Sequence, residues 1–143
     1  MKKLFLLSAI ALGLTFTSCN KDDDGGNNSA PLEGKWYYSE EGIGANGQVV
    51  LQDYDDHEVG CEKDYIEFLE GGVFKDVDYY NTDCESYTDT TVWERSENTV
   101  TVGTGEFSQT AKITLLNSNV LKLTVTENMG GQSASYITVY TRN

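Results

Sequence analysis

Acidic side chains and a single histidine are the groups of this chain that could support catalysis. Asp76 and Asp78 lie two residues apart and could be drawn as the paired acids of a glycoside hydrolase. On a β-strand, however, residues two apart share a face and lie about 7 Å from each other, and a solvated outer face explains both acids better. His57 lies in an acidic loop, and no nucleophile elbow, phosphate-binding loop or zinc-ligand spacing accompanies it. The chain is therefore not predicted to be an enzyme, and we assign no catalytic residue and no cofactor.

The acidic loop also raises the question of a metal site. The segment Asp53–Glu58 contains four acids, and Ca²⁺ is bound by six to eight hard oxygen ligands. The segment lacks the order of acids and glycine that defines an EF-hand, so a solvated loop is the preferred interpretation. A site built on Cys61 and Cys84 lacks partners, because His57 is the only histidine. No metal ligand is therefore assigned.

The amino-terminal residues have the pattern of an export signal. Lys2 and Lys3 precede an apolar run from Leu4 to Phe16. This run is shorter than the roughly 20 residues that span a bilayer, and it suits the core of a signal peptide.

The end of this signal, Phe16-Thr17-Ser18-Cys19, resembles the lipobox of bacterial lipoproteins, although Phe16 replaces the more usual Leu. The resemblance implies that residues 1–18 are removed and that Cys19 carries the lipid that holds the chain at a membrane. The alternative is a soluble secreted protein that is cleaved near Ser18.

A charged run directly after Cys19 provides a second localisation signal. The segment Asn20–Asp24, a lysine followed by three acids, resembles the surface-export signal of Bacteroidetes-type lipoproteins. It implies an outer-membrane lipoprotein that faces the cell surface; the alternative is a solvated start to a linker. Residues 19–31 are polar and end at Pro31, so we expect a flexible linker there and a folded domain over residues 32–143.

Net charge limits the partners of the chain. The formal charge is −13, and removal of the signal peptide takes away two lysines and no acid. Nucleic acids and other polyanions are therefore not expected as partners.

With Cys19 assigned to lipid, two cysteines remain. Cys61 and Cys84 form an even pair in an exported protein, and such pairs are predicted to form disulfides. A disulfide between them would close a loop of 23 residues and would contribute about 3 kcal/mol to stability in the loop-entropy model.

Short strands are predicted throughout the domain. From Leu32 onward, apolar and polar residues alternate with a period of two, most clearly over residues 120–126, and no helical stripe is visible. Turn residues separate the runs: Asn46-Gly47, Gly71-Gly72, Glu97-Asn98, Gly103-Thr104-Gly105, Asn117-Ser118-Asn119 and Gly130-Gly131. Short connections between neighbouring runs predict an all-β, antiparallel, up-and-down barrel or a two-layer sandwich of eight or nine strands.

The first strand carries a family resemblance. Gly34-Lys35-Trp36 resembles the Gly-x-Trp signature of lipocalins, in which the Trp closes the base of the barrel and a late basic residue packs on it. Arg142 stands where that basic residue is expected.

The order of further motifs resembles the lipocalin-like domain of Bacteroidetes lipoproteins. After Trp36 come Cys61, the aromatic strand Tyr65–Phe68, the Gly72-Val73-Phe74 hairpin, Cys84 and Trp93, in that order. The resemblance covers residues 32–142 and implies a lipocalin-like barrel.

Such a barrel implies a cup that binds a small molecule. The strand positions expected to point into the barrel carry mainly aliphatic and aromatic residues, whereas Lys112 and Lys122 occupy the alternating positions expected to point outward. A small apolar or neutral ligand, or a glycan, is therefore favoured over an anionic lipid. The expected ligand or partner contacts are Tyr38, Phe68, Tyr79 and Trp93.

The alternative is a surface module with a filled barrel, which binds a protein or a glycan through exposed aromatic rings and loops. Nine tyrosines are many for this length, and in the pairs Tyr37-Tyr38 and Tyr79-Tyr80 one ring of each must point outward.

Thr90 carries one smaller motif. The sequence Asp89-Thr90-Thr91 resembles the O-glycosylation acceptor of the same bacterial group, so Thr90 is a candidate for modification.

Overall fold

The computed structural model describes residues 28–45 and 47–142. The predicted signal peptide and Cys19 lie outside these residues. The described part forms nine strands and one 3₁₀ turn: β1 (Gly34–Ala45), β2 (Gln48–Asp53), β3 (Tyr65–Leu69), β4 (Val73–Tyr79), β5 (Ser86–Ser96), β6 (Thr99–Val102), η1 (Gly105–Phe107), β7 (Gln109–Leu116), β8 (Val120–Met129) and β9 (Gln132–Thr141). Within it, no helix has the length and apolar character needed to cross a membrane.

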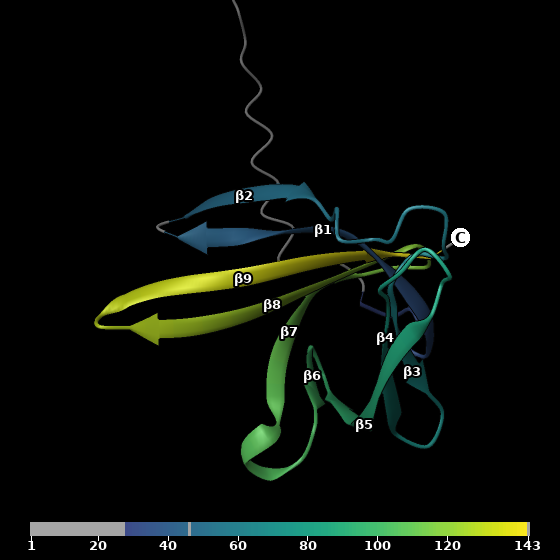
Figure 1. Cartoon of the computed structure of the whole chain (residues 1–143). Coiled ribbons are helices and arrows are strands. Elements are labelled where there is room, and N and C mark those ends of the chain that lie inside the picture. The colour runs from purple at the N-terminus through teal and green to yellow at the C-terminus, as the bar shows by residue number, and fades with distance from the viewer. Residues whose placement is uncertain (1–27, 46, 143) are drawn as a thin grey trace, which may run out of the picture.

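The strands form one antiparallel sheet that closes on itself. From β3 to β9 each strand pairs with the next in sequence, and β1 joins β3 to β9. The extra strand β2 pairs with Glu40–Ala45 of β1, beyond the residues of β1 that pair with β3. As Figure 1 shows, β1, β2, β8 and β9 therefore extend past the barrel as a long sheet. The predicted all-β, antiparallel, up-and-down barrel of eight or nine strands is confirmed.

Turn chemistry fixes the order of the strands. Each of the six predicted turn motifs lies between two consecutive strands of the sheet. Between β3 and β4, Gly71 and Gly72 have φ of 83° and 82°, which residues with a Cβ adopt rarely. These turns leave short connections, so that strands adjacent in sequence pair with each other.

The core lies at one end of the barrel. Its residues are apolar and almost completely buried: Leu32, Trp36, Ile66, Phe68, Val100, Ile113, Leu116 and Leu121. They come from five strands and the segment before β1, so the core ties distant parts of the chain together. Burial of side chains of this size contributes roughly 1.5–3 kcal/mol each.

The two longer connections are joined covalently. Cys61, between β2 and β3, forms a disulfide with Cys84, between β4 and β5, with an S–S distance of 2.06 Å and a Cα–Cα distance of 5.4 Å. The predicted disulfide is confirmed.

The segment before β1 already contacts the barrel. Arg95 donates a hydrogen bond of 2.8 Å to the carbonyl of Asn28, and the Asn28 amide donates one of 3.2 Å to the carbonyl of Ile113. Contacts with the barrel therefore begin before the predicted domain boundary at Leu32, and the last residues of the expected linker pack against the folded part.

Candidate ligand-binding site

The base of the barrel is closed by Trp36 and Arg142. The Trp36 ring is fully buried, and its Nε1 donates a hydrogen bond of 2.8 Å to the carbonyl of Leu32. The guanidinium carbon of Arg142 lies 3.7 Å from the centre of the Trp36 ring, a close cation–π contact. The same guanidinium donates hydrogen bonds to the carbonyls of Pro31, Leu32 and Glu33. One side chain near the carboxyl end therefore holds the segment before β1 in place.

Gly34 has a structural reason to precede this tryptophan. Its φ of +112° is one that residues with a Cβ rarely adopt, and a Cβ there would lie 3.4 Å from Nη2 of Arg142. The glycine thus lets the chain turn into β1 beneath the guanidinium.

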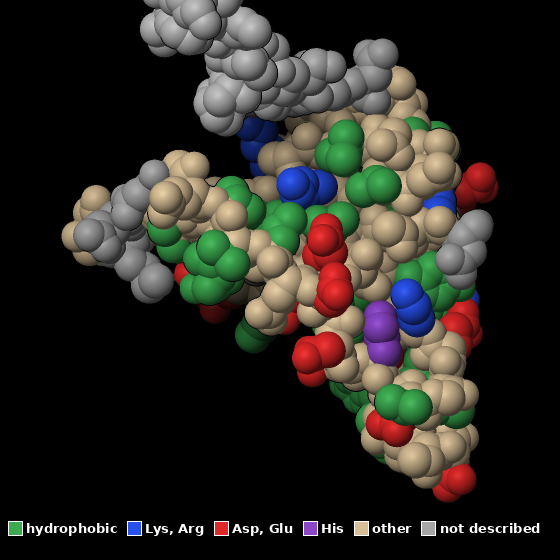
Figure 2. Space-filling view, turned by 90° about the horizontal axis from the view of Figure 1, so that it is seen from above, with side chains coloured by type: hydrophobic (Ala, Val, Ile, Leu, Met, Phe, Trp, Pro, Cys, Tyr) green, Lys and Arg blue, Asp and Glu red, His purple; other side chains and the backbone are tan. Residues whose placement is uncertain are grey.

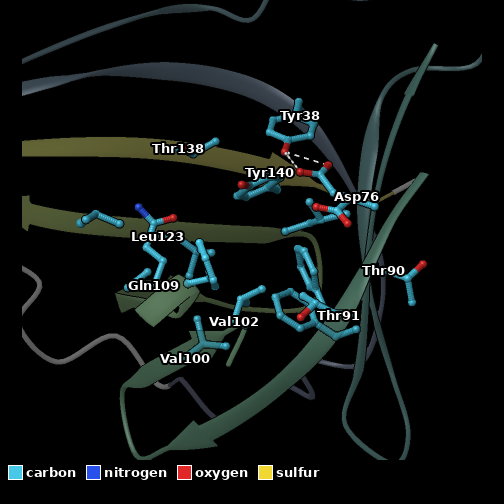
Figure 3. Close-up of a pocket in the computed structure, with 18 of the residues that line it drawn as sticks. Tyr38, Asp76, Thr90, Thr91, Val100, Val102, Gln109, Leu123, Thr138 and Tyr140 are labelled. Atoms are coloured by element: carbon cyan, nitrogen blue, oxygen red, sulfur yellow. Dashed lines mark hydrogen bonds between the residues drawn. The ribbon is translucent and has the colours of Figure 1, made fainter. Parts of the chain in front are cut away.

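A cavity of about 570 Å³ lies inside the barrel, beside this core. Apolar side chains form part of its lining: Ile66, Phe68, Phe74, Val100, Val102, Leu123 and Val125. Polar and tyrosine side chains form the rest, among them Tyr38, Asp76, Asp89, Thr91, Gln109, Tyr136, Thr138 and Tyr140. The lining residues come from β1 and from every strand from β3 to β9, and Figure 3 shows labelled residues of β1 and of β4 to β9 converging on the cavity. The barrel is therefore not filled by its own side chains.

Tyr38 and Asp76 form the polar centre of the cavity. The Tyr38 hydroxyl donates to the Asp76 carboxylate, with distances of 3.0 and 3.2 Å to the two oxygens (Figure 3). The Tyr38 ring lies between those of Tyr54 and Tyr140, each with a centroid distance of 4.8 Å. Burial raises the pKa of Asp76 to about 6, and the nearby Asp89 adds to the shift. Burial also raises the pKa of Tyr38, so this hydroxyl stays protonated and donates.

The place of Asp76 corrects a sequence-based interpretation. Asp76 was expected to share a solvated outer face with Asp78. The structure instead turns Asp76 inward together with Phe74. Val77, on the opposite side of β4, is also buried. Apolar residues on that side therefore do not show which side of β4 faces the inside of the barrel. The aromatic Phe74, in phase with Asp76, was the available signal.

The four expected contact residues separate into two groups. Tyr38 and Phe68 line the cavity. Tyr79 does not line it, and its hydroxyl instead donates to Glu62 at 3.0 Å. The Trp93 indole donates to the carbonyl of Leu69 at 3.0 Å and packs on Phe68 from outside the cavity lining. Asp89, which was not among the expected ligand contacts, also lines the cavity.

Thr90 lies on β5 between Asp89 and Thr91, and all three contribute to the cavity lining. Its side chain is exposed, and Figure 3 shows it turned away from Thr91 and the cavity. A hydroxyl in that place is accessible to a modifying enzyme, and its modification stays a prediction.

The histidine has a structural environment. Nδ1 of His57 accepts a hydrogen bond of 3.1 Å from the backbone N–H of Asp64. Nε2 therefore carries the proton and donates to the carbonyl of Tyr38 at 3.1 Å. His57 thus ties the loop after β2 to β1. Across residues 28–45 and 47–142, no group of three or more histidines, cysteines or acids is placed to hold a metal ion.

A second, shallower hollow of about 380 Å³ adjoins the cavity where β1, β2 and β9 extend past the barrel, and Tyr136 and Thr138 line both. Ile43, Val50 and Tyr136 line it, and each is largely exposed. Figure 2 shows hydrophobic side chains gathered toward this projecting end of the molecule. The surface is apolar but lacks the enclosure of the cavity inside the barrel.

Solved structures share this fold. An uncharacterized protein from Bacteroides eggerthii superposes with a TM-score of 0.51 and 13% identity, over 79% of this chain and 100% of that one. Lobster apocrustacyanin A1 gives a TM-score of 0.51 and 16% identity, over 78% of this chain and 60% of that one. A lipocalin-like protein from Bacteroides uniformis is a weaker match, with a TM-score of 0.47 and 15% identity over 73% of this chain and 96% of that one, and the shared fold does not rest on it. No curated protein matches the sequence.

The sequence itself matches a family model. The model described as a lipocalin-like domain covers residues 32–123, more than half of the chain. That range includes the Gly34–Trp36 signature, both disulfide cysteines and most of the residues that line the cavity. The chain therefore belongs to the lipocalin-like domain family.

Proposed function

We propose that this chain is an outer-membrane lipoprotein that faces the cell surface and binds a small, mainly apolar molecule inside its barrel. In this proposal residues 1–18 are the signal peptide, Cys19 carries the lipid, and the residues up to Pro31 connect the lipid to the barrel. The domain acts by binding and does not catalyse a reaction.

The cavity is the observation that carries the binding proposal. Its volume of about 570 Å³ lies within the range of roughly 300–1,000 Å³ that small-molecule sites occupy. Aromatic and aliphatic walls with a few converging polar groups are typical of such sites. A filled barrel that acts only through its outer surface would lack this space.

The absence of a catalytic arrangement at the cavity supports binding over catalysis. Among the described residues, His57 lies outside the cavity lining, with both ring nitrogens engaged by backbone groups. Tyr38 and Asp76 are hydrogen-bonded to each other, and among the described residues that line the cavity none is Ser, Cys, Lys or His.

The anchor rests on the amino-terminal sequence. A basic start, a short apolar run and a small residue before Cys19 fit lipidation, and a diacylated chain binds a bilayer stably. The disulfide between Cys61 and Cys84 leaves Cys19 as the unpaired cysteine, which supports its assignment to lipid. Mass spectrometry of the membrane-extracted protein tests whether Cys19 carries lipid. A Cys19→Ala variant is expected in the soluble fraction. An unlipidated wild-type chain would overturn the anchor.

A neutral fluorescent probe tests the cavity. N-phenyl-1-naphthylamine is expected to bind the wild-type protein at one site with increased fluorescence. Leu123→Trp fills the cavity and is expected to abolish binding, whereas Lys122→Trp adds the same ring on the opposite face of β8 and leaves binding unchanged. Equal binding by the two variants, with both folded by circular dichroism, would contradict the proposal.

The outer apolar surface favours a second candidate function, contact with a protein or glycan partner. Val49 and Val50 on β2 are 56% and 73% exposed, and Ile43 on β1 is 55% exposed. Exposed apolar side chains clustered on one edge are typical of interaction surfaces. A Val49→Ser/Val50→Ser variant is expected to lose such a partner in a pull-down and to keep the naphthylamine probe. Retention of the partner by this variant would exclude the surface.

A further inference from the structure

Two carboxylates lie opposite each other in the lining of the cavity, with Asp76 half-buried and Asp89 exposed. Asp76 of β4 and Asp89 of β5 are direct partners in the antiparallel register, and both line the cavity. Side chains paired in this way have Cβ atoms about 4.5–5.5 Å apart, and like charges in such a pair destabilise the sheet. The ligand-free barrel therefore holds two acids in a repulsive arrangement.

The cavity offers no positive charge to balance them. Among the described residues that line it, none is Lys, Arg or His. The Tyr38 hydroxyl is the side-chain donor that reaches the Asp76 carboxylate. Since the pKa of Asp76 is about 6, its carboxylate is mostly ionised at neutral pH despite its burial. A half-buried anion without a cationic partner is partly desolvated, and a bound cation that pairs with it stabilises it.

Aromatic rings beside the two acids complete a site for an organic cation. Tyr38 and Tyr140 pack against each other next to Asp76, and Phe74 lies two residues before it on the same face of β4. Ring faces attract an ammonium group, most strongly where water is excluded. Val102 and Leu123 line the cavity as apolar walls.

A metal ion fits these residues poorly. Ca²⁺ takes six to eight oxygen ligands, and Mg²⁺ requires an octahedral set. The cavity brings two carboxylates together, and no cluster of three or more metal-ligating side chains occurs within the described residues. An ammonium group needs fewer ligands, because its N–H groups donate directly to carboxylates.

We propose that the ligand of this barrel is a protonated primary or secondary amine on an apolar body, with its ammonium group between Asp76 and Asp89. The inference rests on the proposed function, since it requires that the barrel binds a small molecule. It replaces the neutral ligand favoured by the sequence with a cationic one, because the sequence analysis placed Asp76 on the outer face.

Matched ten-carbon probes test the charge of the ligand. Decylammonium, decanol and decanoate differ in the head group alone, and calorimetry at about pH 7.5 and submicellar concentrations compares their affinities. Decylammonium is expected to bind at least about tenfold more tightly than decanol, and decanoate is expected to bind more weakly than both. Decyltrimethylammonium, which lacks N–H donors, is expected to fall between decylammonium and decanol.

Three variants locate the effect. Asp76→Asn and Asp89→Asn are each expected to reduce the preference for decylammonium over decanol by about tenfold and to leave decanol affinity within about twofold. Glu94→Gln removes an exposed acid from β5 outside the cavity and is expected to change neither. Circular dichroism checks that each variant is folded. If Asp76→Asn does not fold, Asp89→Asn alone tests the proposal.

The outcomes separate the two proposals. If decanol binds as tightly as decylammonium, or if both cavity variants keep the wild-type preference, the barrel binds small molecules but the amine inference is wrong. If none of the probes and no naphthylamine binds, the proposed function itself fails.

Discussion

The guanidinium of Arg142, at the carboxyl end of the chain, lies 3.7 Å from the centre of the Trp36 ring on β1. It also donates to carbonyls of the segment that precedes β1. The base of the barrel therefore depends on contact between residues more than a hundred positions apart in the sequence. Its integrity keeps the cavity closed at that end.

Substitution of Arg142 is expected to weaken the fold. Arg142→Ala removes a cation–π contact and charged hydrogen bonds, which together contribute about 2 kcal/mol to the free energy of unfolding. Arg142→Lys is expected to retain about half of this contribution, because an ammonium group can contact the Trp36 ring but cannot donate to three carbonyls at once. Urea unfolding measures both changes. Lys112→Ala, on the exposed face of β7, serves as control, and an Arg142→Ala protein as stable as this control would contradict the role.

Reduction of the disulfide is expected to destabilise the protein by about 3 kcal/mol, because the bond closes a loop of 23 residues. Urea unfolding with and without a phosphine reductant measures the effect. A Cys61→Ala/Cys84→Ala variant should unfold at the lower urea concentration under both conditions. If the reductant lowered the urea midpoint of this variant too, or left that of the wild type unchanged, the disulfide would not be the source of the stability.

Removal of the Asp76 charge is expected to stabilise the ligand-free protein at neutral pH. The folded protein holds the proton of Asp76 up to about pH 6, against an ordinary value of 3.8, so ionisation costs stability as the pH rises through this window. Asp76→Asn still accepts the Tyr38 hydrogen bond and should be about 1–2 kcal/mol more stable than wild type at about pH 7.5, with allowance for solvent screening. The gain should vanish near pH 4.

Urea unfolding at both pH values tests this expectation. The charged or titratable groups that face Asp76 are Tyr38, Tyr140, Asp78, Asp89 and Asp64. None of them is a cation, so the sign of the effect does not depend on a competing ion pair. An Asp76→Asn protein less stable than wild type at both pH values would instead assign Asp76 a purely structural role.

The sequence predicted the framework of the barrel well. Alternation in β8, where Leu121 and Leu123 face inward, and turn residues such as Gly71-Gly72 reflect local chemistry that a sequence displays directly. The resemblance built on Gly34 and Trp36 implied the same architecture. These features depend on neighbours in the chain or on a short motif.

The site was harder to predict, because its polar residues contradict the simplest pattern. In β4 the buried Val77 lies opposite in phase to Asp76, so hydrophobicity alone selects the wrong inner face. The opposition of Asp76 and Asp89 depends on the register between two strands. Only the paired structure reveals that register, and with it the acidic character of the cavity.

The position of a bound ammonium ligand tests the central proposal most directly. Nuclear Overhauser effects between decylammonium and methyl-labelled protein report which side chains the alkyl chain contacts. Signals to Val102 and Leu123 inside the barrel are expected, and they should be much weaker in Asp76→Asn at the same ligand concentration. Signals confined to Ile43, Val49 and Val50 on the outer surface would contradict the proposal, because the ligand would then bind outside the cavity.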